Sequence, residues 1–276
     1  KNLDMWIGGV IGINNSSLNI HHTVVNNVTD LKFLHADNNC DIYYSGLVGR
    51  ASYSDKKINI NEVDLTINVS INSILYSSLR GLYISALFND GWAVSGDNIK
   101  ISINKLNTEF QSDYYSDVRR SVLCSTCSHV EMKNIYVYFN DLNPGGDDDI
   151  SMISDARNAN LSNVGLRSQS RSKIYFPGKD VTDSNFTNIY CDAFSVDDSN
   201  NFDTIVYEYG SDDIPYFVTN SSKYENDAKT VEIMNKSLSD QNSKLPSGKY
   251  LPWVVGDDGN PTLKFDATEA EMYTIP

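Results

Sequence analysis

Pairs of aliphatic residues with small neighbours recur along much of the chain. The pattern is clearest in Gly9-Val-Ile-Gly12 and Gly46-Leu-Val-Gly49, and three looser copies follow in which serine, alanine or a bulkier residue replaces the glycines. These copies are Ser85-Ala-Leu-Phe88, Ser121-Val-Leu-Cys124 and Ser151-Met-Ile-Ser154. Because successive copies start about 30–40 residues apart, the spacing predicts a protein built from stacked structural repeats.

Apolar and polar residues alternate one by one after several of these copies. The alternation is seen in Ile58-Asn-Ile-Asn-Glu-Val63, Ile99-Lys-Ile-Ser-Ile103 and Ile135-Tyr-Val-Tyr-Phe139. A period of two is typical of a β-strand with one buried face. We therefore predict that each repeat forms one coil of strands and that neighbouring coils stack about 4.8 Å apart. A non-repetitive β-sandwich with glycine-tolerant strands is the alternative that this pattern leaves open.

The glycines beside the aliphatic pairs are unusual in predicted strands, because glycine has no side chain to pack there. In a stack of coils, small residues would let the chain turn a tight corner without clashes between Cβ atoms, while the aliphatic pair fills the interior. The later copies keep a small residue but lose the glycines, so we expect the corner to require small size and not a positive φ. The predicted repeat core consists of Val10, Ile11, Leu47, Val48, Leu87, Leu123 and Ile153.

The later repeats also share an apolar-x-Asn-aliphatic phrase, found in Met132-Lys-Asn-Ile-Tyr136, Leu161-Ser-Asn-Val-Gly165 and Phe186-Thr-Asn-Ile-Tyr190. Together with the glycine-flanked pairs, this phrase resembles the GLUG-motif repeats of bacterial surface and adhesin-like proteins. In that family Gly-Gly-Leu-Val-Gly precedes a polar turn and an aliphatic-Asn strand. The resemblance covers about residues 5–195, and the copies after the second have lost the glycines. It implies an all-β fold, a right-handed parallel β-solenoid (β-helix) on a large extracellular protein.

The periodicity changes near residue 200, which divides the chain into a repeat solenoid at 1–200 and a C-terminal capping segment at 201–276. A helical period appears at 224–238, with Ala228, Val231, Met234 and Leu238 on one face. Two short strands around the turn Asp257-Asp-Gly-Asn260 predict a hairpin, with Trp253 in the core of the cap. We expect this helix and hairpin to cover the open end of the solenoid, since an uncovered end exposes apolar side chains and strand edges.

The chain begins at Lys1 without an initiator methionine or a signal peptide, and Lys1 leads directly into a repeat. The sequence is therefore interpreted as a mature product or an excised piece. We expect further coils before Lys1, or another subunit that covers this end.

The balance of charges narrows the range of partners. The formal net charge of −14 argues against a nucleic-acid partner, because phosphate binding requires clustered Lys and Arg. No apolar run approaches the roughly 18 residues that a transmembrane helix requires. An acidic chain that is rich in Asn and Tyr and poor in Lys favours an extracellular or cell-surface location. If the source is a eukaryote, sequons that could carry glycans stand at Asn15, Asn27, Asn68, Asn160, Asn185, Asn220 and Asn235.

Four cysteines, Cys40, Cys124, Cys127 and Cys191, are too few for a disulfide framework in a chain of 276 residues. Cys124-Ser-Thr-Cys127 has the spacing of a redox motif or of half a zinc site. Neither a second CxxC nor a βαβ pattern accompanies it, so packed thiols or a local disulfide are the favoured interpretations.

The histidines, His21, His22, His35 and His129, form no recognisable metal-binding motif. His21 and His22 lie in a predicted strand, where neighbouring side chains point to opposite faces. We therefore expect that these two histidines cannot bind one metal ion together.

Acidic clusters are the remaining source of catalytic or metal-binding groups. They stand at 147–149, 197–198, 212–213 and 257–258, each beside Gly, Asn or Ser, a setting typical of solvated turns. The sequence contains no phosphate-binding loop and no nucleophile elbow. We predict that the chain is not an enzyme and holds no cofactor. Calcium is the one cation that these oxygen-rich turns favour, although no EF-hand is present.

Tyrosines near strand positions are the strongest functional lead. A tyrosine on a rigid surface provides contact area for a protein or a glycan at low entropic cost, but stacking between coils is an equally good interpretation. The residues concerned are Tyr43, Tyr44, Tyr53, Tyr76, Tyr83, Tyr114, Tyr115, Tyr136 and Tyr138.

The predicted function is that of a non-catalytic extracellular module in a surface, adhesion or filament-forming protein. Such a module would bind a protein or a glycan through its rigid repeat surface, or assemble with copies of itself. Two alternatives stay open. One is a carbohydrate-active β-helix enzyme, a polysaccharide lyase or hydrolase, and the other is the stalk of a secreted protease.

Overall fold

The computed structural model describes residues 4–33, 41–51, 57–73, 81–110, 118–140, 150–168, 174–175, 180–191, 217–223, 227–242 and 253–264. Within these residues the fold is almost entirely β-strand, arranged in successive coils. The first coil contains β1 (Met5–Gly8), β2 (Ile11–Asn14) and β3 (Leu18–Phe33), and the second contains β4 (Asp41–Ser45), β5 (Val48–Ala51) and β6 (Ile58–Ser73). The third contains β7 (Gly81–Ser85), β8 (Phe88–Trp92) and β9 (Val94–Phe110).

The fourth and fifth coils each consist of one long strand, whereas the sixth again consists of three. The fourth is the single long strand β10 (Val118–Phe139), the fifth is β11 (Ile150–Ser168), and the sixth contains β12 (Ile174–Tyr175), β13 (Asp180–Thr182) and β14 (Asn185–Cys191). After β15 (Phe217–Lys223) the chain forms α1 (Asp227–Asn242), the one helix of the described residues, and then the strands β16 (Trp253–Val255) and β17 (Pro261–Leu263).

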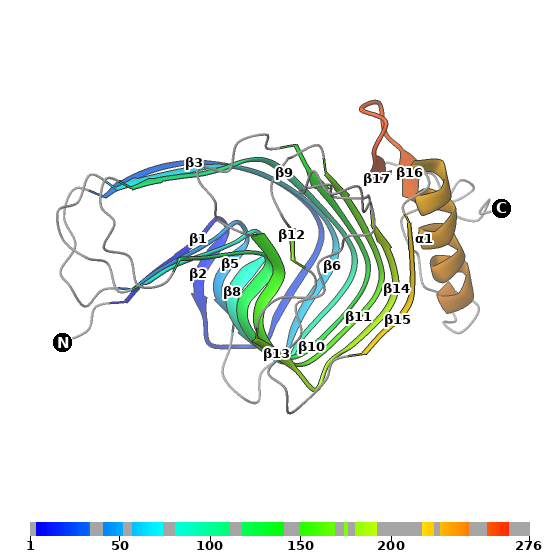
Figure 1. Ribbon diagram of the computed structural model, residues 1–276, viewed down its shortest axis with the longest axis horizontal. Helices are drawn as coiled ribbons and strands as arrows, with labels where there is room; N and C mark the ends of the chain where they lie inside the picture. Colours follow the sequence, from blue (N-terminus) through cyan, green and yellow to red (C-terminus); the bar gives the residue numbers. More distant parts are fainter. Residues whose placement is uncertain are drawn as a thin grey trace, which may run out of the picture.

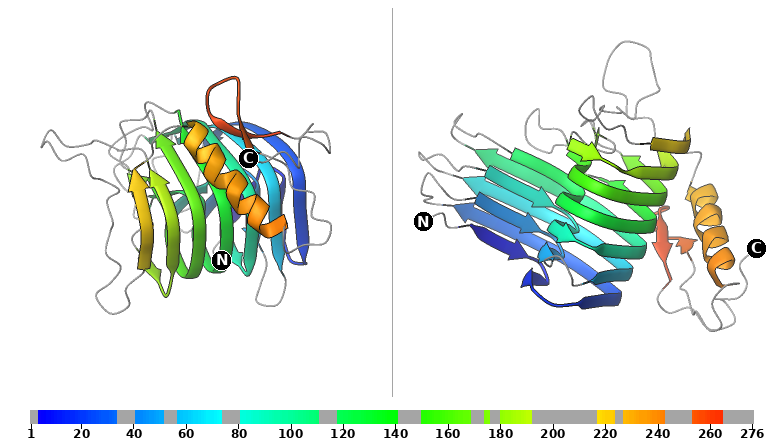
Figure 2. Two further views of the ribbon diagram at one scale, coloured as in Figure 1. Left: turned by 90° about the vertical axis from the view of Figure 1, so that its right-hand side faces the viewer. Right: turned by 90° about the horizontal axis from the view of Figure 1, so that it is seen from below.

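Each strand of a coil pairs in parallel with the equivalent strand of the next coil. One row runs from β1 through β4, β7, β10, β11 and β14 to β15, and β3, β6 and β9 form a second row that also joins β10. Trp6 lies opposite Tyr43, which lies opposite Tyr83 in the following coil. The result is a parallel β-solenoid whose wall curves around one interior (Figures 1 and 2). This arrangement confirms the predicted fold class.

Two corners of the coil are formed by columns of residues with positive φ. The first column contains His22, Glu62, Asn98, Asn134, Asn163 and Asn188, which occupy equivalent places between paired residues of successive coils. The second contains Ala93, His129, Asn158 and Asp183. Asparagine dominates the first column, and Asn158 and Asp183 stand in the second, because the short polar side chains of Asn and Asp tolerate this backbone conformation better than most residues do.

The amides of the first column form an asparagine ladder, made of Asn134, Asn163 and Asn188. Asn188 donates from Nδ2 to Oδ1 of Asn163 over 2.9 Å, and Asn163 donates to Oδ1 of Asn134 over 3.1 Å. Asn134 in turn donates to Oδ1 of Asp97 over 2.9 Å. The repeated Asn of the apolar-x-Asn-aliphatic phrase is therefore the residue that turns each coil and links it to the next.

The predicted repeat core is largely inside the solenoid. Leu47, Val48, Leu87, Leu123 and Ile153 are fully buried, and Ile11 packs against the same core while partly exposed. Val10 is not part of the core, because 52% of its surface is exposed. It lies in the first coil, and among the described residues only the second coil pairs with this coil.

The glycine bends need small residues because neighbouring coils come very close there. A Cβ atom on Gly46 would collide with the backbone carbonyl oxygen of Ala86 and with Cδ1 of Ile67, and one on Gly9 would collide with the carbonyl oxygen of Gly46. Neither Gly9 nor Gly46 has a positive φ. The bend therefore demands small size for the sake of close approach, as the sequence indicates.

The predicted helix and hairpin are present, but they lie against the outer side of the stack and not over its end (Figures 1 and 2). Trp253 is buried and donates from Nε1 to Oδ1 of Asn98 over 3.2 Å, and Lys100 donates to Oγ1 of Thr262 over 2.9 Å. Tyr136 donates to Oδ1 of Asn260 over 3.1 Å. The helix and hairpin cover this side because the alternation of β10 places two large aromatic residues, Tyr136 and Tyr138, on the outer face of the strand. Burying these rings requires other apolar residues to pack over them.

We expect Gly46→Ala to destabilise the protein by about 1–3 kcal/mol, because the added methyl group must displace backbone atoms of the next coil. Gly12→Ala is the matched control, since the nearest atom to a Cβ there is the Trp6 carbonyl oxygen at 3.5 Å. We expect this control to change the free energy of unfolding by less than about 0.5 kcal/mol. Urea unfolding measures both values, and equal effects of the two substitutions would contradict the packing explanation.

Asp97 should make stability depend on pH between about 4 and 6. Burial raises the pKa of this carboxyl group from 3.8 to about 6, although Lys133 and Asn134 oppose the rise. The folded state therefore binds a proton in this range that the unfolded chain does not bind, so stability falls as the pH rises through about 6. The lost stability amounts to about 3 kcal/mol at most, at about 1.36 kcal/mol for each pKa unit.

The measurement is the free energy of unfolding of the wild type and of Asp97→Asn at pH 4 and at pH 7. The variant can still accept the hydrogen bond from Asn134, but it cannot titrate. We expect its stability relative to the wild type to improve on going from pH 4 to pH 7. The same difference at both pH values would show that Asp97 does not titrate as we describe.

Candidate functional site

Three aromatic rings stack on the outer face of the first three coils. Trp6 on β1, Tyr43 on β4 and Tyr83 on β7 occupy the same position in register, and each is partly exposed. The rings of Trp6 and Tyr43 are 3.8 Å apart and inclined by 3°, and those of Tyr43 and Tyr83 are 4.7 Å apart and inclined by 11°. We call this column the aromatic ladder. Its rings point outward because their neighbours in each strand, such as Ile42 and Tyr44, fill the interior.

Two arginines extend the aromatic ladder. Arg119 follows Tyr83 in register, and its Cζ lies 5.8 Å from the centre of the Tyr83 ring. Arg50 lies on β5, beyond the glycine bend, and its Cζ lies 4.9 Å from the centre of the Trp6 ring. Both distances suit cation–π attraction. The bend thus brings the outer faces of two consecutive strands together around the ladder.

Each arginine is also paired with an aspartate. Arg50 Nε lies 3.2 Å from Oδ2 of Asp90, and Arg119 Nη1 lies 4.0 Å from Oδ2 of Asp155. Burial raises the pKa of Asp90, and the charge of Arg50 opposes this rise. We refer to the aromatic ladder with Arg50, Asp90, Arg119 and Asp155 as the ladder face. It offers ring edges, phenol groups and planar guanidinium donors on a rigid surface.

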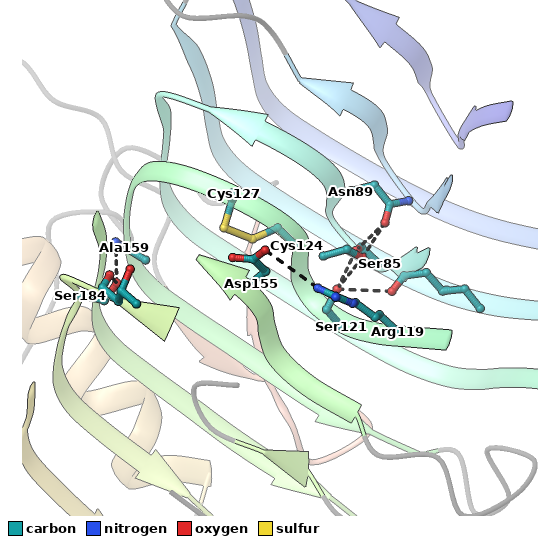
Figure 3. The surroundings of a disulfide bond; sticks show 12 residues. Ser85, Asn89, Arg119, Ser121, Cys124, Cys127, Asp155, Ala159 and Ser184 are labelled. Carbon is teal, nitrogen blue, oxygen red and sulfur yellow. Dashed lines mark hydrogen bonds and ion pairs between the residues drawn. A yellow bond between two sulfur atoms is a disulfide. The ribbon is translucent and has the colours of Figure 1, made fainter. Parts of the chain in front are cut away.

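A buried cluster of hydroxyl and amide groups supports the bend behind the ladder face (Figure 3). The Oγ atom of Ser85 lies 2.7 Å from Oγ of Ser121, 2.8 Å from Oγ of Ser125 and 3.0 Å from Oδ1 of Asn89. Asn89 also donates to the carbonyl oxygen of Tyr44. All these side chains are buried, and buried polar groups that satisfy one another rigidify a core. We assign them a structural role.

A disulfide bond joins Cys124 and Cys127 within β10, so the local disulfide is the correct one of the two interpretations (Figure 3). Both cysteines are buried, which argues against a role in thiol exchange because that reaction needs an accessible sulfur atom. Cys191 lies on β14, and Cys40 falls outside the described residues.

The tyrosines named in the sequence lie in different environments in the structure. Tyr43 and Tyr83 stack between coils, Tyr44 points into the core, and Tyr136 and Tyr138 lie beneath the helix and hairpin. The remaining four fall outside the described residues; they are Tyr53, Tyr76, Tyr114 and Tyr115. Trp6 is not among the residues predicted to be functional, although it stands three residues before its bend, as Tyr43 and Tyr83 do.

Two of the sequon asparagines cannot accept a glycan in the folded protein. Asn27 is buried and donates from Nδ2 to the carbonyl oxygen of Gly46, and Asn235 is buried and donates to the carbonyl oxygen of Trp253. The side chains of Asn15, Asn160 and Asn185 are exposed, Asn68 is partly buried, and Asn220 lies on β15.

The acidic turn at 257–258 is a hairpin turn, as predicted. Gly259 has a φ of 78°, and Oδ1 of Asp258 accepts a hydrogen bond of 3.0 Å from the backbone of Asn260. The other three acidic clusters, at 147–149, 197–198 and 212–213, fall outside the described residues.

The prediction that His21 and His22 point to opposite faces is wrong. His22 has a φ of 55°, so the alternation of the strand is interrupted at this residue. The Nδ1 atoms of His21 and His22 lie 3.9 Å and 3.2 Å from the same atom, Oε2 of Glu62. His129 belongs to the other corner column, where its ring packs near that of Trp92, and His35 falls outside the described residues.

Comparisons with known proteins found no match: no family model fits the chain, and no curated protein or solved structure is similar enough to be paired with it. Among the described helical residues, none forms a segment long and apolar enough to cross a membrane.

Arg50→Gln should raise the pKa of Asp90 further, because the opposing charge is removed while the burial stays. The carboxyl carbon of Asp90 can be followed by NMR in a pH titration. Lys229→Gln is the control, since Lys229 pairs with Glu232 within α1, which carries none of the ladder-face residues. An unchanged Asp90 titration in Arg50→Gln would show that the ion pair is not formed in solution.

Proposed function

We propose that this chain is a non-catalytic extracellular module of a surface, adhesion or filament-forming protein, and that the ladder face binds a protein partner. The observation that carries the proposal is the stack of Trp6, Tyr43 and Tyr83 with an arginine near each end. Trp, Tyr and Arg are the residue types that contribute most to the energy of protein interfaces. Their order in the free protein also means that little side-chain entropy is lost on binding.

The geometry favours a protein over a glycan as the partner. A sugar ring packs on the open face of an aromatic ring, but here Tyr43 has a stacked ring on each side. Ring edges, phenol hydroxyl groups and guanidinium groups are left for contact, and these suit a mixed apolar and polar protein surface.

Two features support the non-catalytic and extracellular parts of the proposal. Asp90 and Asp155, the carboxylates of the ladder face, are each engaged by an arginine, whereas a glycosidase needs two carboxyl groups aimed at one bond. The disulfide between Cys124 and Cys127 is of a kind that persists in oxidising compartments outside the cytosol.

The test is adhesion of the chain, displayed on beads, to an array of immobilised extracellular proteins and polysaccharides. We expect binding to at least one protein. We further expect the combined variant Trp6→Ala, Tyr43→Ala and Tyr83→Ala to weaken that binding by at least about tenfold, as loss of interface hot spots does. Val255→Ala is the control, because Val255 is an exposed apolar residue on β16, a strand that carries none of the ladder-face residues.

Three results would contradict the proposal. They are binding to no protein of the array, binding that the ladder variant does not weaken, and cleavage of a polysaccharide by the purified chain. The last result would favour the alternative of a carbohydrate-active β-helix enzyme. Circular dichroism of the ladder variant should show that the strands remain folded.

A further inference from the structure

The corner formed by His21, His22 and Glu62 joins three metal-binding side chains from the first two coils. A nitrogen from each histidine and a carboxylate oxygen of Glu62 all lie within 4.8 Å of one another. His22 approaches the carboxylate to 3.2 Å and His21 to 3.9 Å. Among the described residues, no other group of three such side chains comes this close together.

The corner column explains why these side chains meet. His22 and Glu62 occupy the places that Asn134, Asn163 and Asn188 fill in later coils. An asparagine can both donate to one neighbour and accept from the other, which sustains a ladder of amides. The amide ladder ends before Glu62, because Asn134 donates to Asp97 and Asn98 accepts from Nε1 of Trp253. An ionised glutamate only accepts. The imidazole and carboxylate groups at this end of the column replace the amides with groups that a cation can bridge.

The spacing is close to that of a tetrahedral metal centre. Zinc binds nitrogen and oxygen at about 2.0–2.2 Å, which separates neighbouring ligand atoms by about 3.3 Å. The distance of 3.2 Å between His22 and Glu62 already matches. His21 lies 3.9 Å from the same oxygen, and the three ligand atoms lie within 4.8 Å of one another, so rotation of the His21 side chain must bring its nitrogen closer. The side chain of Glu62 is 12% exposed and therefore held in place, whereas those of His21 and His22 are 70% and 46% exposed and can rotate.

We propose that His21, His22 and Glu62 bind a zinc ion that links the first coil to the second. Two imidazoles and one carboxylate suit zinc better than calcium or magnesium, which prefer sites made of oxygen ligands. The net charge of −14 favours a cation anywhere on this surface. Three protein ligands leave one position open for water or for a group from a partner.

The test is isothermal titration of the full chain with zinc chloride, repeated with calcium chloride. We expect the wild type to bind zinc at this corner and to prefer zinc over calcium. His22→Asn is the first variant, because asparagine is the residue that this column accepts at positive φ. Glu62→Gln is the second variant, and it removes the anionic oxygen while keeping the size of the side chain. We expect each to weaken zinc binding at least tenfold.

His129→Gln is the control, since His129 is exposed and lies in the other corner column. It should leave the titration unchanged, and zinc should shift the NMR signals of the His21 and His22 rings. The proposal is overturned if the wild type binds no zinc, if zinc binding persists in both variants, or if calcium binds more tightly than zinc. None of these outcomes depends on the ladder face, so the two proposals stand or fall separately.

Discussion

Parallel, in-register pairing between coils is the constraint on which the rest of this structure depends. Because each strand lies on its equivalent in the next coil, a residue at one place in a coil is paired with the residue at the same place in its neighbours along most of each strand. Side chains therefore form columns, and each column must be compatible with itself along the stack. The aliphatic interior, the asparagine ladder, the buried serines and the aromatic ladder are four such columns. Each contains groups that pack or hydrogen-bond well with their own kind.

This constraint explains which parts of the fold could be predicted from the sequence. The glycine-flanked aliphatic pairs and the alternation around Ile58, Ile99 and Ile135 are local patterns that repeat at the period of the coil, so they predict the solenoid and most of its core. Two details of the site could not be predicted in this way. His22 has a positive φ, and alternation rules for strands do not apply across such a residue. The stacking of Trp6 on Tyr43 depends on register, which becomes visible only when the copies are aligned on their bends.

The C-terminal segment shows where local patterns stop being informative. Its helical period and its turn at 257–260 predict a helix and a hairpin, and both exist. Their place on the molecule depends on a surface from another part of the chain, where Tyr136 and Tyr138 project from β10 and join Met234 and Trp253. One signal of that surface is present in Ile135-Tyr-Val-Tyr-Phe139. Two large aromatic residues stand at the strand positions that would otherwise be polar, which indicates that other residues cover this side of the strand.

The helix and hairpin also make the stack mechanically uneven. Hydrogen bonds of the hairpin residues Asn260 and Thr262 reach four coils, at Asp64 in the second, Lys100 in the third, Tyr136 in the fourth and Arg167 in the fifth. The hairpin therefore links four consecutive coils, whereas the described residues of the first coil are held by their pairing with the second. A pulling force along the stack would therefore detach the first coil before it separates the coils that the hairpin links.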